Sequence, residues 1–275
     1  MWGAIVGDVI GSVYEFDNTK DYDFEMFARG SRFTDDTVMT VAVAEAVTKY
    51  LVGGRKEDLS ALATDCMFRL GNEFRNVAWG ARFRRWLRDP QPYDSLGNGS
   101  AMRISSVGWL ARSEEEVKEF SRAVTIVSHG HPEGIKGAEA VAMATYLARN
   151  GVSVEDIRKR MTTDYYPEIP DLSYDMLNKE YDWIWRCMNG VTCQASVPQA
   201  IVCFLEGRDY EDAIRKSVSI GGDSDTIASM AGAIAEAYYG LPESFVRKAK
   251  ECLPKKMLEI IGYVEENGYK GKIIK

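Results

Sequence analysis

Apolar and small residues recur at helical spacing in segment after segment of this chain, and this periodicity restricts the fold more than any other feature. Runs that alternate apolar with polar residues and are rich in β-branched side chains are almost absent. A parallel sheet would need several Val/Ile-rich strands between the helices. The pattern therefore predicts an all-α domain with helices at 35–51, 114–127, 137–148, 197–206, 209–218 and 224–239.

The connections between these segments carry the glycine and proline residues expected of turns. The stretch 162–174 is the least helical, and we expect it to form a surface loop or a lid. The chain has 275 residues, of which 45% are hydrophobic, and it contains neither a fixed-period repeat nor a low-complexity tract. This is enough to bury a substantial core, so we expect residues 1–275 to form a single domain.

The charge balance excludes some partners. The formal net charge is -7, and such a field repels polyanions, so broad nucleic-acid or membrane-surface binding is not expected. The five cysteines form no CxxC pair, as is typical of reduced thiols in the cytosol. The first residues lack a basic segment and carry Asp8, unlike a signal peptide, and no stretch has the ~18–20 apolar residues of a membrane span. We expect a cytoplasmic, monomeric protein.

Two acidic clusters stand where small-residue helices are predicted to begin. Thr34, Asp35 and Asp36 open one of these helices, and Asp223, Asp225 and Thr226 open the other. One acidic residue or threonine at such a position usually caps the helix by accepting backbone N–H hydrogen bonds. Each cluster, however, has more acidic residues than capping requires, which favours a second role.

That second role depends on whether the two helix starts converge. If they meet with Glu15, five carboxylates share one small space. Two like charges ~4 Å apart repel by about 4 kcal/mol at an effective dielectric constant near 20, so divalent cations would be needed to offset the repulsion. Carboxylate and threonine oxygens suit Mg²⁺, Mn²⁺ or Ca²⁺, whereas zinc sites normally use histidine or cysteine.

Histidine is too scarce for a zinc or iron centre, since His129 and His131 are the only two and lie in one loop. The 12-residue calcium loop of an EF-hand is also absent. The residues therefore favour a centre with two divalent cations, Mg²⁺ or Mn²⁺.

Two loops are candidates for anion binding. The glycine-rich segment 96–103 could direct backbone N–H groups at phosphate oxygens, with Arg103 as a counter-charge, although an ordinary turn or helix cap is an equal reading. In the loop 128–140, His129 could donate to a phosphate or ribose oxygen, or it could simply bind backbone. A base could stack on one of the aromatic residues, which include Trp79, Trp86, Tyr93, Tyr165, Tyr166, Tyr181, Trp183 and Trp185.

Five segments, in order along the chain, resemble the ADP-ribosylglycohydrolase family, which includes the bacterial enzyme that reactivates dinitrogenase reductase. Each segment alone is unspecific, but together they span most of the chain. They are GDVIGSVYEF (7–16), FTDDT (33–37), GNGSAMR (97–103), SHGHPEGIKGA (128–138) and SIGGDSDTIASMAGAIAEAYYG (219–240).

The resemblance implies an orthogonal multi-helix all-α fold and a dinuclear Mg²⁺ or Mn²⁺ centre that binds ADP-ribose. By position in the family's motifs, it implies catalytic roles for Glu15, Asp35 and Asp36. The implied metal ligands are Thr34, Asp35, Asp36, Asp223, Asp225 and Thr226, with Asp225 as the bridging ligand. The implied contacts to phosphate and ribose are Gly99, Ser100, Met102 and His129.

The implied activity is hydrolysis of the N- or O-glycosidic bond between ADP-ribose and a modified acceptor, with a protein arginine side chain favoured. Two other readings stay open. One is a non-catalytic ADP-ribose-binding or structural protein on the same fold, and the other is a nucleotide phosphohydrolase. Retention of the whole set of mutually repelling acidic residues argues for the hydrolase, because a structural relic would not need them.

Overall fold

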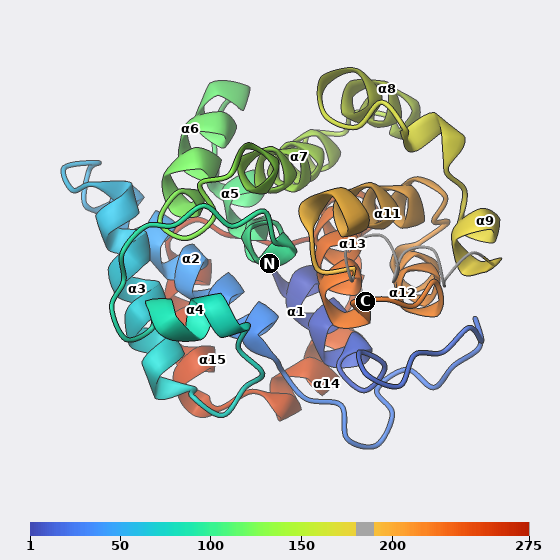
Figure 1. Ribbon diagram of the computed structural model, residues 1–275, viewed down its shortest axis with the longest axis horizontal. Helices are drawn as coiled ribbons and strands as arrows, with labels where there is room; N and C mark the ends of the chain where they lie inside the picture. The colour runs from blue at the N-terminus through green and yellow to red at the C-terminus, as the bar shows by residue number, and fades with distance from the viewer. Residues whose placement is uncertain (180–189, 275) are drawn as a thin grey trace.

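Almost all regular secondary structure is helical in the computed structural model, which describes residues 1–179 and 190–274 (Figure 1). The α-helices are α1 (Trp2–Gly11), α2 (Asp35–Val52), α3 (Leu59–Glu73), α4 (Ala81–Trp86), α5 (Ser105–Leu110), α6 (Glu114–Thr125), α7 (Pro132–Arg149), α8 (Val154–Asp164), α9 (Tyr174–Lys179), α11 (Cys193–Leu205), α12 (Tyr210–Ser219), α13 (Ser224–Tyr239), α14 (Glu243–Cys252) and α15 (Lys255–Glu266). Two short 3₁₀ helices are η1 (Asn98–Ser100) and η2 (Ile169–Asp171), and the two-residue strands β1 (Leu241–Pro242) and β2 (Ile273–Ile274) pair in parallel. The predicted all-α class is confirmed.

The helices predicted from apolar spacing are present with small shifts at their ends, as α2, α6, α7, α11, α12 and α13. The prediction of a loop over 162–174 is wrong in part, because its first three residues complete α8 and residues 169–171 form η2. Ile157 and Met161 are four residues apart on α8, and both side chains are buried. Their packing stabilises the helix up to and beyond position 161. An ion pair between Arg160 and Asp164 closes its last turn.

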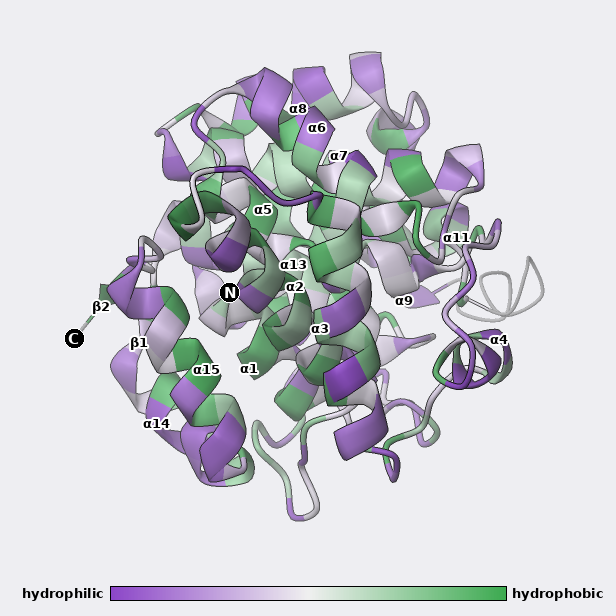
Figure 2. Ribbon diagram, turned by 90° about the vertical axis from the view of Figure 1, so that its left-hand side faces the viewer, coloured by the Kyte–Doolittle hydropathy of each residue, from purple (hydrophilic) through white to green (hydrophobic). Residues whose placement is uncertain are grey.

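Helices α1 and α13 lie side by side in the middle of the molecule, although they come from opposite ends of the chain (Figure 1). Every residue of α1 is buried, and α13 is buried from Ser224 to Ala237. In Figure 2 the central helices are largely green, whereas outer helices such as α6 and α8 show purple faces to solvent. In the described part of the chain, none of the helices has both the length and the apolar character needed to cross a bilayer.

Glycine allows α1 and α13 to touch backbone to backbone. Gly3, Gly7 and Gly11 are four residues apart and share one face of α1. A Cβ at Gly7 would lie 2.1 Å from the carbonyl oxygen of Ala228, and a Cβ at Gly11 would lie 2.5 Å from Cα of Asp225. This contact therefore fixes the position of Asp225 at the start of α13 relative to α1.

Replacing Gly7 with alanine should lower the free energy of unfolding by about 1–3 kcal/mol, because the added methyl group collides with the backbone of α13. The intrinsic helix preference of alanine, about 1 kcal/mol, acts in the opposite direction. Urea unfolding followed by circular dichroism measures the change.

The matched control is Gly262→Ala in α15, where an added Cβ meets no atom within 4 Å. This variant should be unchanged or more stable by up to about 1 kcal/mol, since only helix preference acts there. Equal effects of the two substitutions would contradict the role assigned to the contact between α1 and α13.

Candidate functional site

A cavity of about 410 Å³ opens where the starts of α2 and α13 meet the segments 78–83 and 93–103. One end of this cavity is acidic, and its walls come from both ends of the chain. The lining residues there are Glu15, Asp35, Asp36, Asp223, Asp225 and Thr226. We call this end the carboxylate end.

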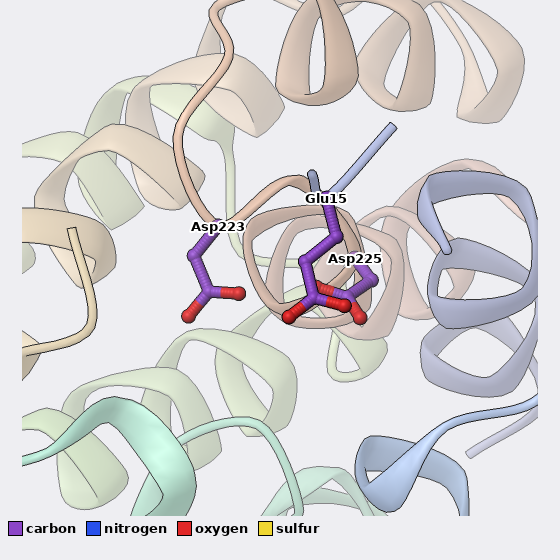
Figure 3. Close-up of side chains that lie close together, drawn as sticks. All are labelled: Glu15, Asp223 and Asp225. Atoms are coloured by element: carbon purple, nitrogen blue, oxygen red, sulfur yellow. The ribbon is translucent and has the colours of Figure 1, made fainter. Parts of the chain in front are cut away.

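The carboxylates lie close together in space. Glu15, Asp223 and Asp225 each present an oxygen, and these three oxygens lie within 4.8 Å of one another (Figure 3). The two helix starts are also joined directly, because Oγ1 of Thr226 donates to Oδ2 of Asp36 at 3.1 Å. The starts of α2 and α13 therefore converge with Glu15, as the prediction of a shared carboxylate site required.

The start of α2 is held by Asp8, the one charged residue of the buried helix α1. Its carboxylate accepts hydrogen bonds from the backbone N–H groups of Thr34 and Thr37, both at 3.0 Å, and from both threonine hydroxyls. These four bonds satisfy donors at the N-terminus of α2, where negative charge is also favoured by the helix dipole. Asp8 thereby fixes the backbone that carries Asp35 and Asp36.

The same bonds orient the hydroxyl of Thr34. This hydroxyl donates its proton to Asp8 at 2.7 Å and accepts from the backbone N–H of Asp36 at 3.2 Å. A hydroxyl has one donor and two lone pairs, so one lone pair is left for a further partner. Thr34 is buried and is not one of the described residues that line the cavity. Its role as a metal ligand stays a prediction.

The carboxylate end is electrostatically strained when no cation is bound. Burial raises the pKa of Asp35 to about 8, and the negative charges of Asp8, Asp223 and Glu15 add to the effect. Burial also holds the pKa values of Asp36 and Asp225 well above the usual range, again reinforced by neighbouring carboxylates. At the rim of the cavity, burial and then Asp223 raise the pKa of Glu15 to about 7.

These residues fit divalent cations. Oδ1 of Asp36 is buried and has no hydrogen-bond partner within the described residues, so a strong acceptor is left unsatisfied at the cavity. The lining side chains at this end offer only oxygen atoms, which Mg²⁺ and Mn²⁺ prefer. A bound cation would both satisfy Asp36 and neutralise the repulsion between the carboxylates.

The glycine-rich loop is fastened to the carboxylate end through Asn98. Its side-chain Nδ2 donates to Oδ2 of Asp223 at 2.7 Å, and its backbone N–H donates to the carbonyl of Val191 at 2.9 Å. Gly99 and Met102 line the cavity beside it. A shift of the loop would therefore break or stretch the hydrogen bond between Asn98 and Asp223.

A chain of hydrogen bonds from Arg103 through Ser128 orients the imidazole ring of His129. Nη2 of buried Arg103 donates to Oγ of Ser128 at 2.9 Å, and this oxygen lies 2.8 Å from Nδ1 of His129. Burial, reinforced by the charges of Arg103 and Arg82, holds the pKa of His129 well below its usual value. Because Oγ of Ser128 already accepts from Arg103, its proton is free to be donated to Nδ1 of the neutral imidazole, and that arrangement puts the ring proton on Nε2.

Nε2 of His129 lies next to Gly99, where a Cβ would stand only 3.1 Å away, and both residues line the cavity. Arg103 is 1% exposed and also lines the cavity, yet within the described residues no carboxylate pairs with it. Burial lowers its pKa to about 10, so it remains a cation at neutral pH. The cavity therefore also offers a positive charge and a hydrogen-bond donor beside the glycine-rich loop.

Most of the predicted substrate contacts line this cavity, but Ser100 does not. Its buried hydroxyl donates to the carbonyl of Gly134 at 2.8 Å, so the side chain binds α7. Among the aromatic candidates, Trp79 and Tyr93 line the cavity. Trp86 is buried and donates to the carbonyl of Val127. Tyr181, Trp183 and Trp185 lie outside the described residues.

The sequence prediction does not include the roles that Asp8 and Asn98 have in the structure. Asp8 is noted there only as a charge that a signal peptide would not carry, although a carboxylate inside an apolar helix is a signal of a buried partner. Asn98 is noted only as part of a glycine-rich loop. Its partner Asp223 is 125 residues away, and no local pattern reveals such a contact.

The structure thus combines an all-α fold with a cavity whose carboxylate end gathers oxygen donors from both ends of the chain. This chain belongs to the ADP-ribosylglycohydrolase family, whose sequence model matches residues 1–269.

Curated relatives cover nearly the whole chain. The chain is similar to ADP-ribosylhydrolase ARH3 of Mus musculus, with 27% identity over 88% of this chain and 84% of the relative, and to ARH3 of Homo sapiens, with 28% identity over 88% and 86%. It is also similar to ADP-ribosylarginine hydrolase Tri1 of Pseudomonas putida (strain GB-1), at 22% identity over 90% and 72%.

A solved structure described as an ADP-ribosylglycohydrolase-related protein complex has the same fold. It superposes with a TM-score of 0.66 at 20% identity, over 96% of this chain and 94% of that chain.

The substitution Asp8→Asn should lower the free energy of unfolding by about 1–3 kcal/mol, because an amide group then faces donors of Thr34 and Thr37 that need acceptors. It should also weaken Mn²⁺ binding, since the backbone that carries Asp35 and Asp36 loses its anchor. Urea unfolding and calorimetric titration with Mn²⁺ measure the two effects.

Asp209→Asn is the matched control, because Asp209 also accepts a backbone N–H hydrogen bond at a helix start, that of α12. It should leave Mn²⁺ affinity unchanged, since it lies outside the cavity. Unchanged Mn²⁺ affinity in Asp8→Asn would show that the start of α2 holds its position without Asp8.

The metal-free protein should become less stable as the pH rises from about 4 to about 8. In the unfolded chain these carboxyl groups titrate near 4. In the folded protein their pKa values are raised, so across this window the folded state holds protons that the unfolded chain has lost. Added Mn²⁺ should reverse the trend, because cations bind the ionised carboxylates.

Thermal unfolding in EDTA and in Mn²⁺, measured at a series of pH values, tests this expectation. The variant Asp225→Asn should show a shallower decline with pH, because it removes one of the buried carboxylates. A melting temperature of the metal-free protein that is constant across the window would contradict the assigned electrostatic strain.

Proposed function

We propose that this protein is a metal-dependent hydrolase that releases ADP-ribose from a modified acceptor. The observation that carries the proposal is the cavity where Glu15, the start of α2 and the start of α13 gather carboxylates around one space. Membership of the ADP-ribosylglycohydrolase family and similarity to curated ADP-ribosyl hydrolases support the same activity.

The side chains that line the cavity suit the different parts of ADP-ribose. At the carboxylate end, Thr34, Asp35 and Asp36 would hold cations from one side and Asp223, Asp225 and Thr226 from the other. The cations would supply Lewis acidity to the ribose hydroxyls and to a water molecule. Elsewhere in the lining, the Arg103 charge and the imidazole of His129 suit a diphosphate, and Tyr93 and Trp79 offer aromatic surface for a base.

The protein's own side chains would do three things during cleavage. Asn98 and the glycine-rich loop bind and orient the ligand relative to Asp223. The carboxylates of Glu15 and Asp35 line the cavity where a water molecule would be directed at the anomeric carbon. Their negative charge also stabilises the oxocarbenium character of a glycosidic transition state.

We further propose a protein side chain as the acceptor, with arginine as the first to be tested. Half-buried Glu15 lies at the carboxylate end, and a carboxylate there suits a cationic leaving group. The similarity to an ADP-ribosylarginine hydrolase supports the same choice.

Purified protein incubated with ADP-ribosylated arginine peptide should release ADP-ribose and unmodified peptide only with Mg²⁺ or Mn²⁺. EDTA should abolish the activity, and added cation should restore it. Asp35→Asn and Asp225→Asn should each lower kcat by about a hundredfold or more, since each removes an oxygen ligand. Chromatography of the released nucleotide measures the products.

Asp58→Asn is the control, because Asp58 caps α3 at the surface and asparagine caps equally well. Its activity should equal that of the unmodified protein. AMP or inorganic phosphate among the products would instead identify a phosphohydrolase. Tight ADP-ribose binding without turnover of arginine, serine or acetyl conjugates would identify a binding protein.

A further inference from the structure

Arginine is concentrated in one short segment beside the cavity. Residues 75–88 contain five arginines and no acidic residue, in a chain whose net charge is -7. All five are exposed, and within the described part of the chain none of them forms an ion pair. They are Arg75, Arg82, Arg84, Arg85 and Arg88.

Part of this segment forms a wall of the cavity, since residues 78–83 line it. Just before the segment, the ring of Phe74 packs edge-on against Phe33 at 5.9 Å, and Phe33 directly precedes the cluster that opens α2. Further along, the guanidinium of Arg82 lies 4.9 Å above the ring of Tyr93. The segment therefore adjoins both the chain that leads into α2 and the aromatic wall of the cavity at Tyr93.

Three of these arginines line a separate groove of about 500 Å³ on the outer side of the segment. We call it the arginine groove, and its cationic members are Arg75, Arg84 and Arg88. Trp79 forms part of the wall of both the groove and the cavity. The side chain of Trp79 thus separates the cavity from the arginine groove.

Two of the groove arginines are held in place by the protein. Arg75 donates to the carbonyl and to the side-chain oxygen of Asn72, at 3.0 and 2.9 Å, and Arg84 donates to the carbonyl of Trp79 at 2.9 Å. Neutral partners orient a guanidinium without neutralising it. Arginine forms paired hydrogen bonds with carboxylates, and the exclusive use of arginine over lysine here favours such recognition.

We propose that the arginine groove binds an acidic segment of the protein that carries the ADP-ribose. This inference rests on the proposed hydrolase function, which puts the modified side chain in the neighbouring cavity. An extended peptide advances about 3.3–3.6 Å per residue, so aspartates and glutamates close to the modified residue reach the groove. The groove then selects acceptors by the charge of the residues next to the modified side chain.

The observations favour a peptide over a nucleic acid. The basic segment is short, since it covers only residues 75–88 and is followed directly by Asp89. A longer polyanion would extend beyond it onto the surface of an acidic protein, where it is repelled. A short acidic peptide matches the charge of the groove without meeting that repulsion.

The test compares two ADP-ribosylated peptides that differ only in the residues beside the modification, which are aspartate and glutamate in one and serine and asparagine in the other. With Mn²⁺ present, the protein should cleave the acidic peptide with a kcat/KM about tenfold higher, and added salt should reduce this preference. The triple variant Arg75→Gln, Arg84→Gln, Arg88→Gln should lose the preference while cleaving the neutral peptide at the original rate.

The control triple variant Arg158→Gln, Lys159→Gln, Arg247→Gln removes the same number of positive charges from α8 and α14. It should keep the preference for the acidic peptide. Equal rates on the two peptides, or a preference that survives in the groove variant, would overturn the inference. An equal loss in both triple variants would also overturn it, because net charge would then suffice.

A binding measurement separates this inference from the proposed function. Fluorescence anisotropy with a labelled acidic peptide that carries no ADP-ribose should detect binding that the groove variant loses. Failure to cleave either modified peptide would contradict the hydrolase, whereas cleavage of both without peptide binding would contradict only the groove. Tighter binding of a single-stranded oligonucleotide of equal charge would overturn the assignment to a peptide.

Discussion

The contact between α1 and α13 is the constraint on which the rest of the molecule depends. Glycines on α1 bring two helix backbones together that would otherwise be separated by side chains, and Gly11 rests against Asp225. Helices from opposite ends of the chain thereby become one central pair. Without that contact, the acidic residues near the N-terminus and those near residue 225 would not face the same cavity.

A second contact adds the start of α2 to this pair. Asp8 leaves α1 with a buried carboxylate that binds Thr34 and Thr37, and Thr226 then reaches across to Asp36. The result is a set of carboxylates held in place by the core and repelling one another in the absence of cations. Fixed geometry is useful for binding hard cations, because the ligands do not have to be gathered when the ion arrives.

The sequence predicts the helices well because apolar spacing is a local property, as α2 and α13 illustrate. It also identifies the acidic residues of the cavity, since excess carboxylates at a helix start have few structural uses. It does not identify the contact of Asp8 with Thr34, nor that of Asn98 with Asp223, because both depend on how distant segments pack. Ser100 illustrates the converse, since motif position alone does not reveal that its side chain points into the interior.

The bond from Asn98 to Asp223 has a consequence for how ligand and cations affect each other. Under the proposed function, a change at Asp223 on cation binding would be transmitted through this bond to the glycine-rich loop, and a change in the loop would be transmitted to Asp223. Thermodynamic linkage requires that any gain in ligand affinity caused by the cations be matched by an equal gain in cation affinity caused by the ligand. If the protein is the proposed hydrolase, the cation concentration that it requires therefore depends partly on the concentration of its substrate.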